Sequence, residues 1–368
     1  MKYYVIAGEA SGDLHGSNLI KQLQLSDSTA HVRCWGGDLM QATGAHLVKH
    51  YRDLAFMGFT EVIKNLPTIL GNLRFCKEDI INYQPDVLIL IDYPGFNLRI
   101  AEWAKKQGFK VVYYIAPQVW AWKANRVKKM KTCIDMMLCI LPFEKDYFKN
   151  QWDWDVQYVG HPLIEVIEKF KLANQSTIKP IIALLPGSRK QEIAKKLPIM
   201  LSVADKFPQY EFVVAKAPGQ EDAFYEPFLE GQHNVNVVKD STYSLLSQST
   251  AALVTSGTAT LETALFGVPE IVCYKGSSIS YQIAKRLVKI KFISLVNLIM
   301  DKEIVKELIQ DELNTANLVR ELQFITSNTE KISELKSEYQ QLYTKLAGGG
   351  HASKNAAQLI SEFLLNKS

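Results

Sequence analysis

Short, almost uninterrupted apolar runs alternate with helical patterns along this chain, and this alternation restricts its fold more than any other feature. In the first half, the runs lie within residues 2–13, 85–108, 110–123 and 136–148. Strands that are apolar on both faces are typical of parallel sheets whose faces are both covered by helices. The sequence therefore predicts an α/β fold based on doubly wound parallel sheets.

The alternation is interrupted at residues 171–180, a polar segment that ends in proline and has no periodicity. It starts again in the second half, with apolar runs within residues 181–189, 210–218, 235–240, 251–257 and 270–274. At 368 residues the chain is too long for one ordinary core. We therefore predict two Rossmann-like domains, residues 1–172 and 173–345, with a cleft between them. Residues 346–368 are predicted to contain a closing helix, with the first domain as its candidate packing partner.

The composition is that of an ordinary globular protein, 47% hydrophobic and 22% charged. The formal net charge is only +4, but basic residues cluster in segments 123–131, 189–196 and 285–291. No nucleic-acid motif accompanies these clusters, so a phosphorylated substrate or an anionic lipid fits them better than nucleic acid. The five cysteines form no CxxC pair, which suggests reduced thiols in a cytosolic protein. No apolar run reaches the ~20 residues that span a bilayer, so we expect a soluble or peripheral protein.

A turn rich in glycine and threonine joins a strand to a helix within residues 255–270, TSGTATLETALFGVPE. A helix N-terminus presents unpaired N–H groups and the positive end of the peptide dipole, so Ser256, Gly257 and Thr258 favour an anion. Glu262, in the first two turns, is placed to accept both ribose hydroxyl groups of a nucleotide. The alternative is that Glu262 only complements the helix dipole.

A second strand of the same half ends in Pro-Gly-Ser-Arg, residues 186–189. Gly187 permits close backbone approach, and Arg189 can bind a phosphate through two hydrogen bonds. Alone, this pattern fits a surface arginine equally well. Together with the turn at residues 256–258, it predicts a two-sided clamp for a diphosphate.

Two acidic residues follow apolar strands in the first half. Asp92 comes directly after the run DVLILI, and Glu9 has the equivalent place in the first strand–helix unit. Ligands of such sheets bind at the carboxyl ends of the strands, so we expect both acids to face the cleft. A carboxylate there can take a proton from an attacking hydroxyl group as a general base. The alternative for Asp92 is a turn residue bonded to nearby N–H groups.

The apolar segment 56–73 is broken by Gly58, Pro67 and Gly71. It fits two short core helices, or an exposed apolar hairpin that docks on lipid or accepts acyl chains. In the hairpin interpretation, the residues that contact lipid are Phe56, Met57, Phe59, Val62, Ile63 and Leu66.

The sequence offers no support for a metal site. The seven histidines show neither HExxH nor another paired ligand spacing. Asp153 and Asp155 form a DxD triplet, a metal-binding pattern in other transferases, but it precedes a strand of the first half and is interpreted as a surface segment. His161 fits either a buried turn or the cleft.

Taken in order along the chain, several segments resemble the lipid-A-disaccharide synthases, bacterial glycosyltransferases of lipid A assembly. The segments are GEASGD (8–13), IDYPGFNLRIA (91–101), APQVWAWK (116–123), ILPFEK (140–145), VGHP (159–162), LLPGSRKQEI (184–193), SGTATLETAL (256–265) and KRLVKIKFISLVN (285–297). The resemblance covers residues 2 to about 310. It implies a GT-B fold, in which the C-terminal domain holds most of the sugar nucleotide.

The resemblance also implies roles for individual residues. Asp92 would be the catalytic carboxylate and Glu9 an acid required for activity, and which of them is the general base stays open. The implied UDP-binding residues are Gly187, Ser188, Arg189, Ser256, Gly257, Thr258, Glu262, Asn297 and Gln310. Two positions depart from the family pattern. Val296 replaces a common proline, and Glu270 stands where an apolar residue is usual.

The implied reaction joins UDP-2,3-diacylglucosamine to 2,3-diacylglucosamine 1-phosphate. Its products are the β-1,6-linked disaccharide 1-phosphate and UDP. Because the donor is α-linked and the product β-linked, the resemblance implies inversion by one displacement, with no metal or other cofactor. The implied location is the cytoplasmic, inner face of the inner membrane of a Gram-negative bacterium, where the protein is peripheral and contacts an anionic surface. The oligomeric state stays open, with a homodimer as one candidate.

Two other kinds of function remain open. One is a different GT-B enzyme of nucleotide sugars, such as a UDP-N-acetylglucosamine epimerase or a muramyl-pathway transferase. The other is a non-catalytic lipid-binding module that keeps the nucleotide fold.

Overall fold

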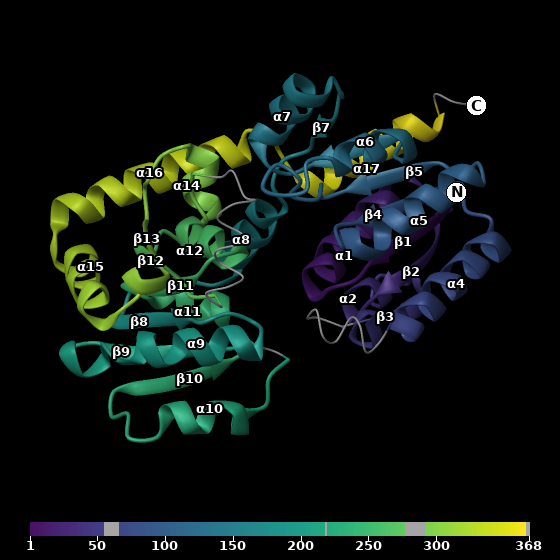
Figure 1. The fold of residues 1–368 in the computed structure, drawn as a ribbon. Coiled ribbons are helices and arrows are strands. Elements are labelled where there is room, and N and C mark those ends of the chain that lie inside the picture. The colour runs from purple at the N-terminus through teal and green to yellow at the C-terminus, as the bar shows by residue number, and fades with distance from the viewer. Residues whose placement is uncertain (55–65, 218, 277–290, 366–368) are drawn as a thin grey trace. The chain divides into compact units, whose positions relative to one another are not determined.

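The computed structural model describes residues 1–54, 66–217, 219–276 and 291–365. The chain forms two compact units, Met1–Pro162 with Leu346–Ser368, and Leu163–Lys345. Each unit contains one parallel sheet covered by helices (Figure 1). The predicted α/β class with doubly wound parallel sheets is therefore confirmed.

The first sheet has the strand order β3-β2-β1-β4-β5-β6-β7, and all neighbouring strands are parallel. Its strands are β1 (Lys2–Ala7), β2 (His31–Gly36), β3 (His46–His50), β4 (Val87–Ile91), β5 (Val111–Tyr114), β6 (Met136–Cys139) and β7 (Gln157–Tyr158). The order reverses between β1 and β4. In an open parallel sheet, that switch point is where ligands bind.

Two cores cover the two faces of the first sheet. One is built with the helices α4 (Leu66–Tyr83), α5 (Pro94–Lys106), α6 (Arg126–Cys133) and α7 (Pro142–Trp152). The other contains α1 (Ala10–Ser26), α2 (Asp38–Gln41) and the closing helix α17 (Ala352–Leu365), which packs against α1. Residues of β1 alternate between them, with Tyr4 and Ile6 in one core and Tyr3 and Val5 in the other. This two-sided burial explains why the strand is apolar throughout.

The second sheet has the order β10-β9-β8-β11-β12-β13, again with parallel neighbours. Its strands are β8 (Ile181–Leu185), β9 (Glu211–Lys216), β10 (Val235–Lys239), β11 (Ala251–Thr255), β12 (Glu270–Tyr274) and β13 (Lys306–Ile309). Its helices are α8 (Pro162–Ala173), α9 (Lys190–Leu201), α10 (Asp222–Leu229), α11 (Thr242–Gln248), α12 (Thr258–Phe266), α14 (Leu295–Met300), α15 (Thr315–Ser327) and α16 (Thr329–Ala347). Here the strand order reverses between β8 and β11.

The two units meet in the sequence between Pro162 and Leu163, whereas the sequence analysis placed the boundary between residues 172 and 173. The difference arises because α8 belongs with the second unit. On α8, the Phe170 ring contacts Phe266, and Lys171 donates a hydrogen bond to a backbone oxygen of α12. The polar segment that we took as the linker, residues 171–180, begins within the last turn of this helix.

Part of the proposed apolar hairpin is described. Leu66 opens α4, and further along this helix Leu73, Cys76 and Ile80 are buried in the first core. Phe56, Met57, Phe59, Val62 and Ile63 lie outside the described residues. In the part of the chain that the structure covers, no helix has both the length and the apolar character required to cross a bilayer.

Candidate functional sites in the two units

A cavity of about 490 Å³ lies at the carboxyl ends of β8, β9 and β11 in the second unit. All the predicted UDP-binding residues except Asn297 and Gln310 line it. They are Gly187, Ser188, Arg189, Ser256, Gly257, Thr258 and Glu262. The two glycine turns of the sequence analysis therefore border one cavity, since β8 and β11 are neighbouring strands.

The helix α12 begins at this cavity. Gly257, the residue before it, has a φ of +139°, a backbone conformation that favours glycine. Thr258 and Ala259, in the first turn, both line the cavity. Because the first N–H groups of a helix have no partner within it, this end presents donors and a partial positive charge to the cavity. The arrangement suits an anion.

The turn after β8 adds a cationic side chain. Gly187 has a φ of +117°, and a Cβ there would lie 2.8 Å from Glu192 Oε2, so a larger residue does not fit without strain. The Arg189 side chain is 62% exposed, and its Nη1 lies 3.5 Å from Glu192 Oε1. Such a long, exposed contact is weak, which leaves the guanidinium able to bind an incoming anion.

Glu262 lies in the cavity wall and is partly buried. One carboxylate oxygen accepts a hydrogen bond of 2.8 Å from the Tyr243 hydroxyl group. Burial raises the pKa of Glu262, and the Tyr243 hydrogen bond partly offsets this effect.

Two lysines at this site were missed. Lys216 ends β9, lines the cavity and forms an ion pair of 3.3 Å with Asp222. Lys196, on α9, is buried, and its Nζ donates a hydrogen bond to Thr255 Oγ1. Our sequence analysis included Lys196 in a basic cluster, but its spacing from the buried Ile193 would have placed it on the inner face of the helix. The signal for Lys216 was its position at the end of an apolar strand.

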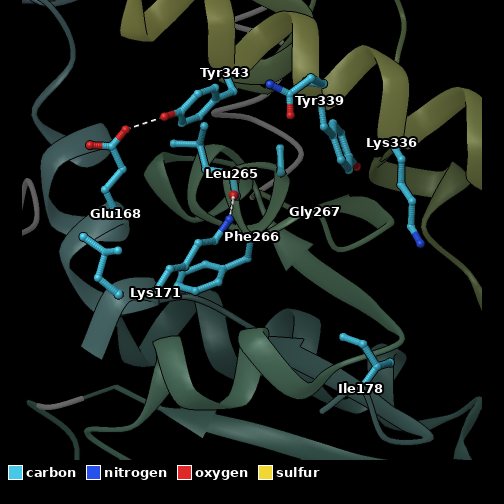
Figure 2. A pocket seen from close by; sticks show the side chains of 12 residues that line it. Glu168, Lys171, Ile178, Leu265, Phe266, Gly267, Lys336, Tyr339 and Tyr343 are labelled. Atoms are coloured by element: carbon cyan, nitrogen blue, oxygen red, sulfur yellow. Dashed lines mark hydrogen bonds between the residues drawn. The ribbon is translucent and has the colours of Figure 1, made fainter. Parts of the chain in front are cut away.

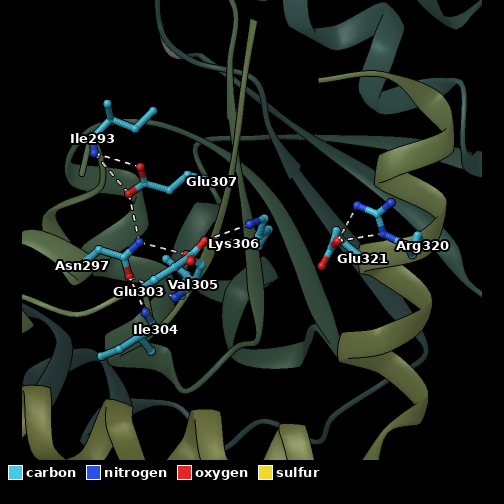
Figure 3. A network of polar contacts seen from close by, with 9 residues as sticks. All are labelled: Ile293, Asn297, Glu303, Ile304, Val305, Lys306, Glu307, Arg320 and Glu321. Atoms are coloured by element: carbon cyan, nitrogen blue, oxygen red, sulfur yellow. Dashed lines mark hydrogen bonds and ion pairs between the residues drawn. The ribbon is translucent and has the colours of Figure 1, made fainter. Parts of the chain in front are cut away.

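Asn297 lies away from the cavity, inside a buried network (Figure 3). Its Oδ1 accepts hydrogen bonds from the backbone N–H groups of Ile304 and Val305, at 2.8 and 3.0 Å. Its Nδ2 donates to Val305 O at 2.9 Å and to Glu307 Oε1 at 3.0 Å. The side-chain amide is therefore fully used within the protein.

The network reaches the cavity through the backbone. Glu307 also accepts hydrogen bonds from the N–H groups of Ile293 and Ser294. The Ile293 carbonyl oxygen in turn accepts a hydrogen bond of 2.8 Å from Ser256 Oγ. Asn297 thus fixes the loop that holds Ser256. Gln310, after β13, accepts a hydrogen bond of 3.0 Å from the Gly276 N–H group and likewise does not line the cavity.

In the first unit, Glu9 and Asp92 follow the paired ends of the neighbouring strands β1 and β4, where Ala7 is opposite Ile91. The Asp92 main chain has a φ of +44°. Its carbonyl oxygen accepts hydrogen bonds from Asn97 Nδ2 at 2.8 Å and the Tyr113 hydroxyl group at 2.5 Å, which fix this turn. Burial, and next the charge of Glu9, raise the pKa of Asp92 to about 6, while the Tyr93 N–H group acts in the opposite direction.

Glu144 is a further buried acid of this unit that we did not single out. It accepts hydrogen bonds from Trp120 Nε1 at 3.1 Å and from the Leu141 N–H group at 3.0 Å, and burial raises its pKa to about 7. Asp92 is among the groups that raise this pKa. His161 is also buried, which lowers its pKa to about 3.

Asp153 and Asp155 are exposed and both form ion pairs with Lys149, at 3.3 and 3.0 Å, in line with the surface interpretation. Within the described ranges, no group of three or more His, Cys, Asp or Glu side chains is arranged to hold a metal ion.

A second cavity of the second unit, about 670 Å³, lies at the C-terminal end of α12 and contains none of the predicted site residues (Figure 2). Its walls come from α8, α12 and α16. Lys171 Nζ donates to Leu265 O at 2.8 Å, and the Tyr343 hydroxyl group donates to Glu168. The helix carbonyl groups at this end carry partial negative charge, so it does not offer the anion site of the other end.

The fold is similar to that of solved enzymes of nucleotide sugars. The UDP-GlcNAc 2-epimerase of Neisseria meningitidis, solved with UDP-GlcNAc, has a TM-score of 0.68 at 15% identity, with 100% of both chains covered. The glycotransferase of kitacinnamycin has a TM-score of 0.65 at 13% identity, with 98% of both chains covered. At these identities the likeness shows the fold alone, and it confirms the predicted GT-B class.

Sequence comparisons are more specific. The family model for lipid-A-disaccharide synthetase matches residues 3–363. The lipid-A-disaccharide synthase of Trichlorobacter lovleyi is 36% identical over 369 residues, which cover 97% of this chain and 96% of that protein. The enzyme of the same name from Geobacter metallireducens is 35% identical, with 99% and 97% covered. The chain therefore belongs to the lipid-A-disaccharide synthase family, glycosyltransferases of lipid A biosynthesis.

Proposed function

We propose that this protein transfers diacylglucosamine from UDP-2,3-diacylglucosamine to the 6-hydroxyl group of 2,3-diacylglucosamine 1-phosphate. The products are the β-1,6-linked disaccharide 1-phosphate and UDP. The observation that carries the proposal is the cavity that places Arg189 and the N-terminus of α12 around one space. Family membership supports the nature of the substrates.

In this proposal the donor's diphosphate occupies the cavity. The first N–H groups of α12, the Arg189 guanidinium and the Lys216 ammonium face the phosphate oxygens, and the ribose lies against Glu262. Solved structures of the same fold contain UDP-GlcNAc or, in the S. aureus MnaA complex, UDP, which supports a UDP-sugar as donor.

These groups also assist bond cleavage. As the glycosidic bond breaks, negative charge grows on the departing UDP, and donors that are already in place stabilise it. Removal of one such donor typically costs about 3–4 kcal/mol of transition-state stabilisation. Because the chain itself supplies this positive charge, we propose that the transfer needs no metal ion.

Asp92 is the proposed general base. A pKa of about 6 keeps it ionised at neutral pH, yet makes it a better proton acceptor than an ordinary aspartate. It removes the proton of the acceptor hydroxyl group as the oxygen attacks the donor's anomeric carbon. One displacement inverts that carbon, so an α-linked donor gives a β-linked product.

We also propose that the protein binds the inner face of the inner membrane, where diacylated substrates reside. Trp122 supports this: its side chain is 51% exposed, and the cations of Lys123 and Arg126 lie 4.1 and 5.7 Å from its ring. Amphipathic aromatic rings beside basic groups suit an anionic interface.

The hairpin interpretation of the segment 56–73 is tested by replacing Phe56, Met57 and Phe59 with Ser. We expect reduced flotation of the variant with anionic liposomes. Equal flotation of variant and wild type would favour the core interpretation.

The function is tested with purified protein, both proposed substrates, detergent and a metal chelator. We expect equal amounts of disaccharide 1-phosphate and UDP, detected by mass spectrometry, and a β linkage by NMR. Activity that requires an added divalent ion would refute the metal-free step. Conversion of UDP-N-acetylglucosamine to its 2-epimer, without disaccharide formation, would replace this function with that of an epimerase.

A further inference from the structure

A buried lysine lies directly beneath the candidate nucleotide cavity without lining it. Lys196 is on α9, which runs beside the second sheet (Figure 1), and only 3% of it is exposed. Its Nζ donates a hydrogen bond to Thr255 Oγ1 and lies 3.8 Å from Glu192 Oε2. A Cβ on Gly187 would be 3.5 Å from the same nitrogen. The neighbours Thr255, Glu192 and Gly187 all line the cavity.

The sequence around Lys196 makes its burial unusual. On α9, the residues Ile193, Leu197 and Met200 form an apolar inner face, and Lys196 lies on that face. An ammonium group has three donors. Among the described residues only Thr255 accepts one of them, and the Glu192 contact is longer than a hydrogen bond. A buried charge with so little compensation is unfavourable unless a function retains it.

The local charges point to an anion as the missing partner. Burial lowers the pKa of Lys196. The charges of Glu192 and Cys273 would raise this pKa, and the charge of Arg189 lowers it further. Cys273 itself is buried, with its pKa raised to about 12, so it stays neutral. At this site, Glu192 is the carboxylate near two cations, Arg189 at 3.5 Å and Lys196 at 3.8 Å, whereas Lys216 has its own ion pair with Asp222. The excess charge is positive.

We propose that Lys196 is a positioning residue for the donor's diphosphate: its ammonium group, beneath the cavity, fixes Thr255 and Glu192 and adds positive charge that the bound phosphates compensate. This inference rests on the proposed function. It adds an electrostatic contribution from below the cavity to the direct contacts of Arg189 and α12. Lys196 also links the end of β11 to the turn after β8, because it bonds to Thr255 and lies close to Gly187.

The experiment is calorimetric titration of UDP, UMP and uridine into the full chain, with Lys196→Met and Lys195→Met compared. Lys195 is the matched control, because it is the neighbouring lysine on the exposed face of the same helix. We expect Lys196→Met to weaken UDP binding roughly tenfold, UMP binding less and uridine binding not at all, as a charge effect requires. Lys195→Met should leave all three unchanged. An equal loss for UDP and uridine, or no loss at all, would overturn the proposal.

A pH series separates charge from packing. As the pH rises above 7, the wild type should lose UDP affinity at lower pH than Lys196→Arg, because burial lowers the pKa of Lys196 whereas an arginine stays protonated. Parallel curves for the two proteins would overturn the proposal, even if Lys196→Met failed to fold. If the wild type binds no UDP, the proposed function itself fails. If it binds UDP and Lys196→Met binds equally well, only the role of Lys196 fails.

Discussion

Glu9 adds to the effect of burial in raising the pKa of Asp92, because the two carboxyl groups follow the paired ends of β1 and β4 at the switch point of the first sheet. Like charges that share a partly buried site disfavour ionisation of each other. Burial, and next the charge of Glu9, therefore convert an aspartate that would be a weak base into one matched to neutral pH. Glu9 thus increases the basicity of Asp92 even without contacting the substrate.

This relationship predicts a shift in the pH dependence of activity. In the wild type, kcat should fall below about pH 6, because protonated Asp92 cannot accept a proton. Glu9→Gln removes a negative charge and so lowers the pKa of Asp92, which should move the acid limb of kcat to lower pH. Glu78→Gln, an exposed change on α4, is the control and should leave the limb in place. An unmoved limb in Glu9→Gln would show that the two acids are not coupled.

Arg189→Ala should weaken UDP binding roughly 10- to 100-fold, the usual value of a charge-assisted hydrogen bond to phosphate. Calorimetry measures this directly. Arg320→Ala removes an exposed arginine from the same unit and should bind UDP like the wild type. If Arg189→Ala kept full affinity, the guanidinium would have no place in the diphosphate site.

Asn297→Ala should lower the free energy of unfolding by about 2–4 kcal/mol, because it leaves several buried polar groups without partners. Thermal or urea unfolding measures the change, and Asn174→Ala on the surface should stay within about 0.5 kcal/mol. UDP affinity should also fall, through the loop that holds Ser256. Normal stability combined with lost UDP affinity would instead favour a direct contact between Asn297 and the nucleotide.

Glu270 predicts an unusual dependence of stability on pH. It is buried, and neither carboxyl oxygen has a hydrogen-bond partner among the described residues. Burial raises its pKa well above that in the unfolded chain, so the folded state binds the proton more tightly. Stability should therefore fall as pH rises above the ordinary range of a glutamate, by up to about 1.4 kcal/mol per pH unit.

Replacing this carboxyl group tests that prediction. Glu270→Leu replaces the buried carboxyl group with an apolar side chain and should raise the melting temperature at neutral pH. Glu270→Gln should remove the decline in stability between pH 5 and pH 8. A decline that persists in both variants would have to come from another group.

The fold and the residues at strand ends could be predicted because they follow from local patterns. Apolar runs identify buried parallel strands, and a parallel sheet places every strand's carboxyl end on one edge. This placed Asp92 and Glu9 on one sheet edge and Arg189 and Thr258 at one cavity. The same reasoning would also have placed Lys216, the last residue of β9, at this cavity.

The features that could not be predicted depend on contacts between residues far apart in the sequence. The side chain of Asn297 is committed to Val305 and Glu307, and nothing in its local pattern indicates that. A Cβ on Gly8 would lie 2.3 Å from the Tyr93 ring, so this glycine accommodates a side chain that is distant in the sequence. The division before α8 likewise depends on packing rather than on local composition.

The most direct test of the whole account is the turnover of Asp92→Asn, with UDP affinity measured on the same preparation. The substitution keeps the shape of the side chain but removes the proposed base. We predict that UDP binds as in the wild type, while the rate of disaccharide formation falls by about 10²- to 10⁴-fold. Turnover near the wild-type rate, with UDP bound normally, would contradict the central claim that Asp92 deprotonates the acceptor.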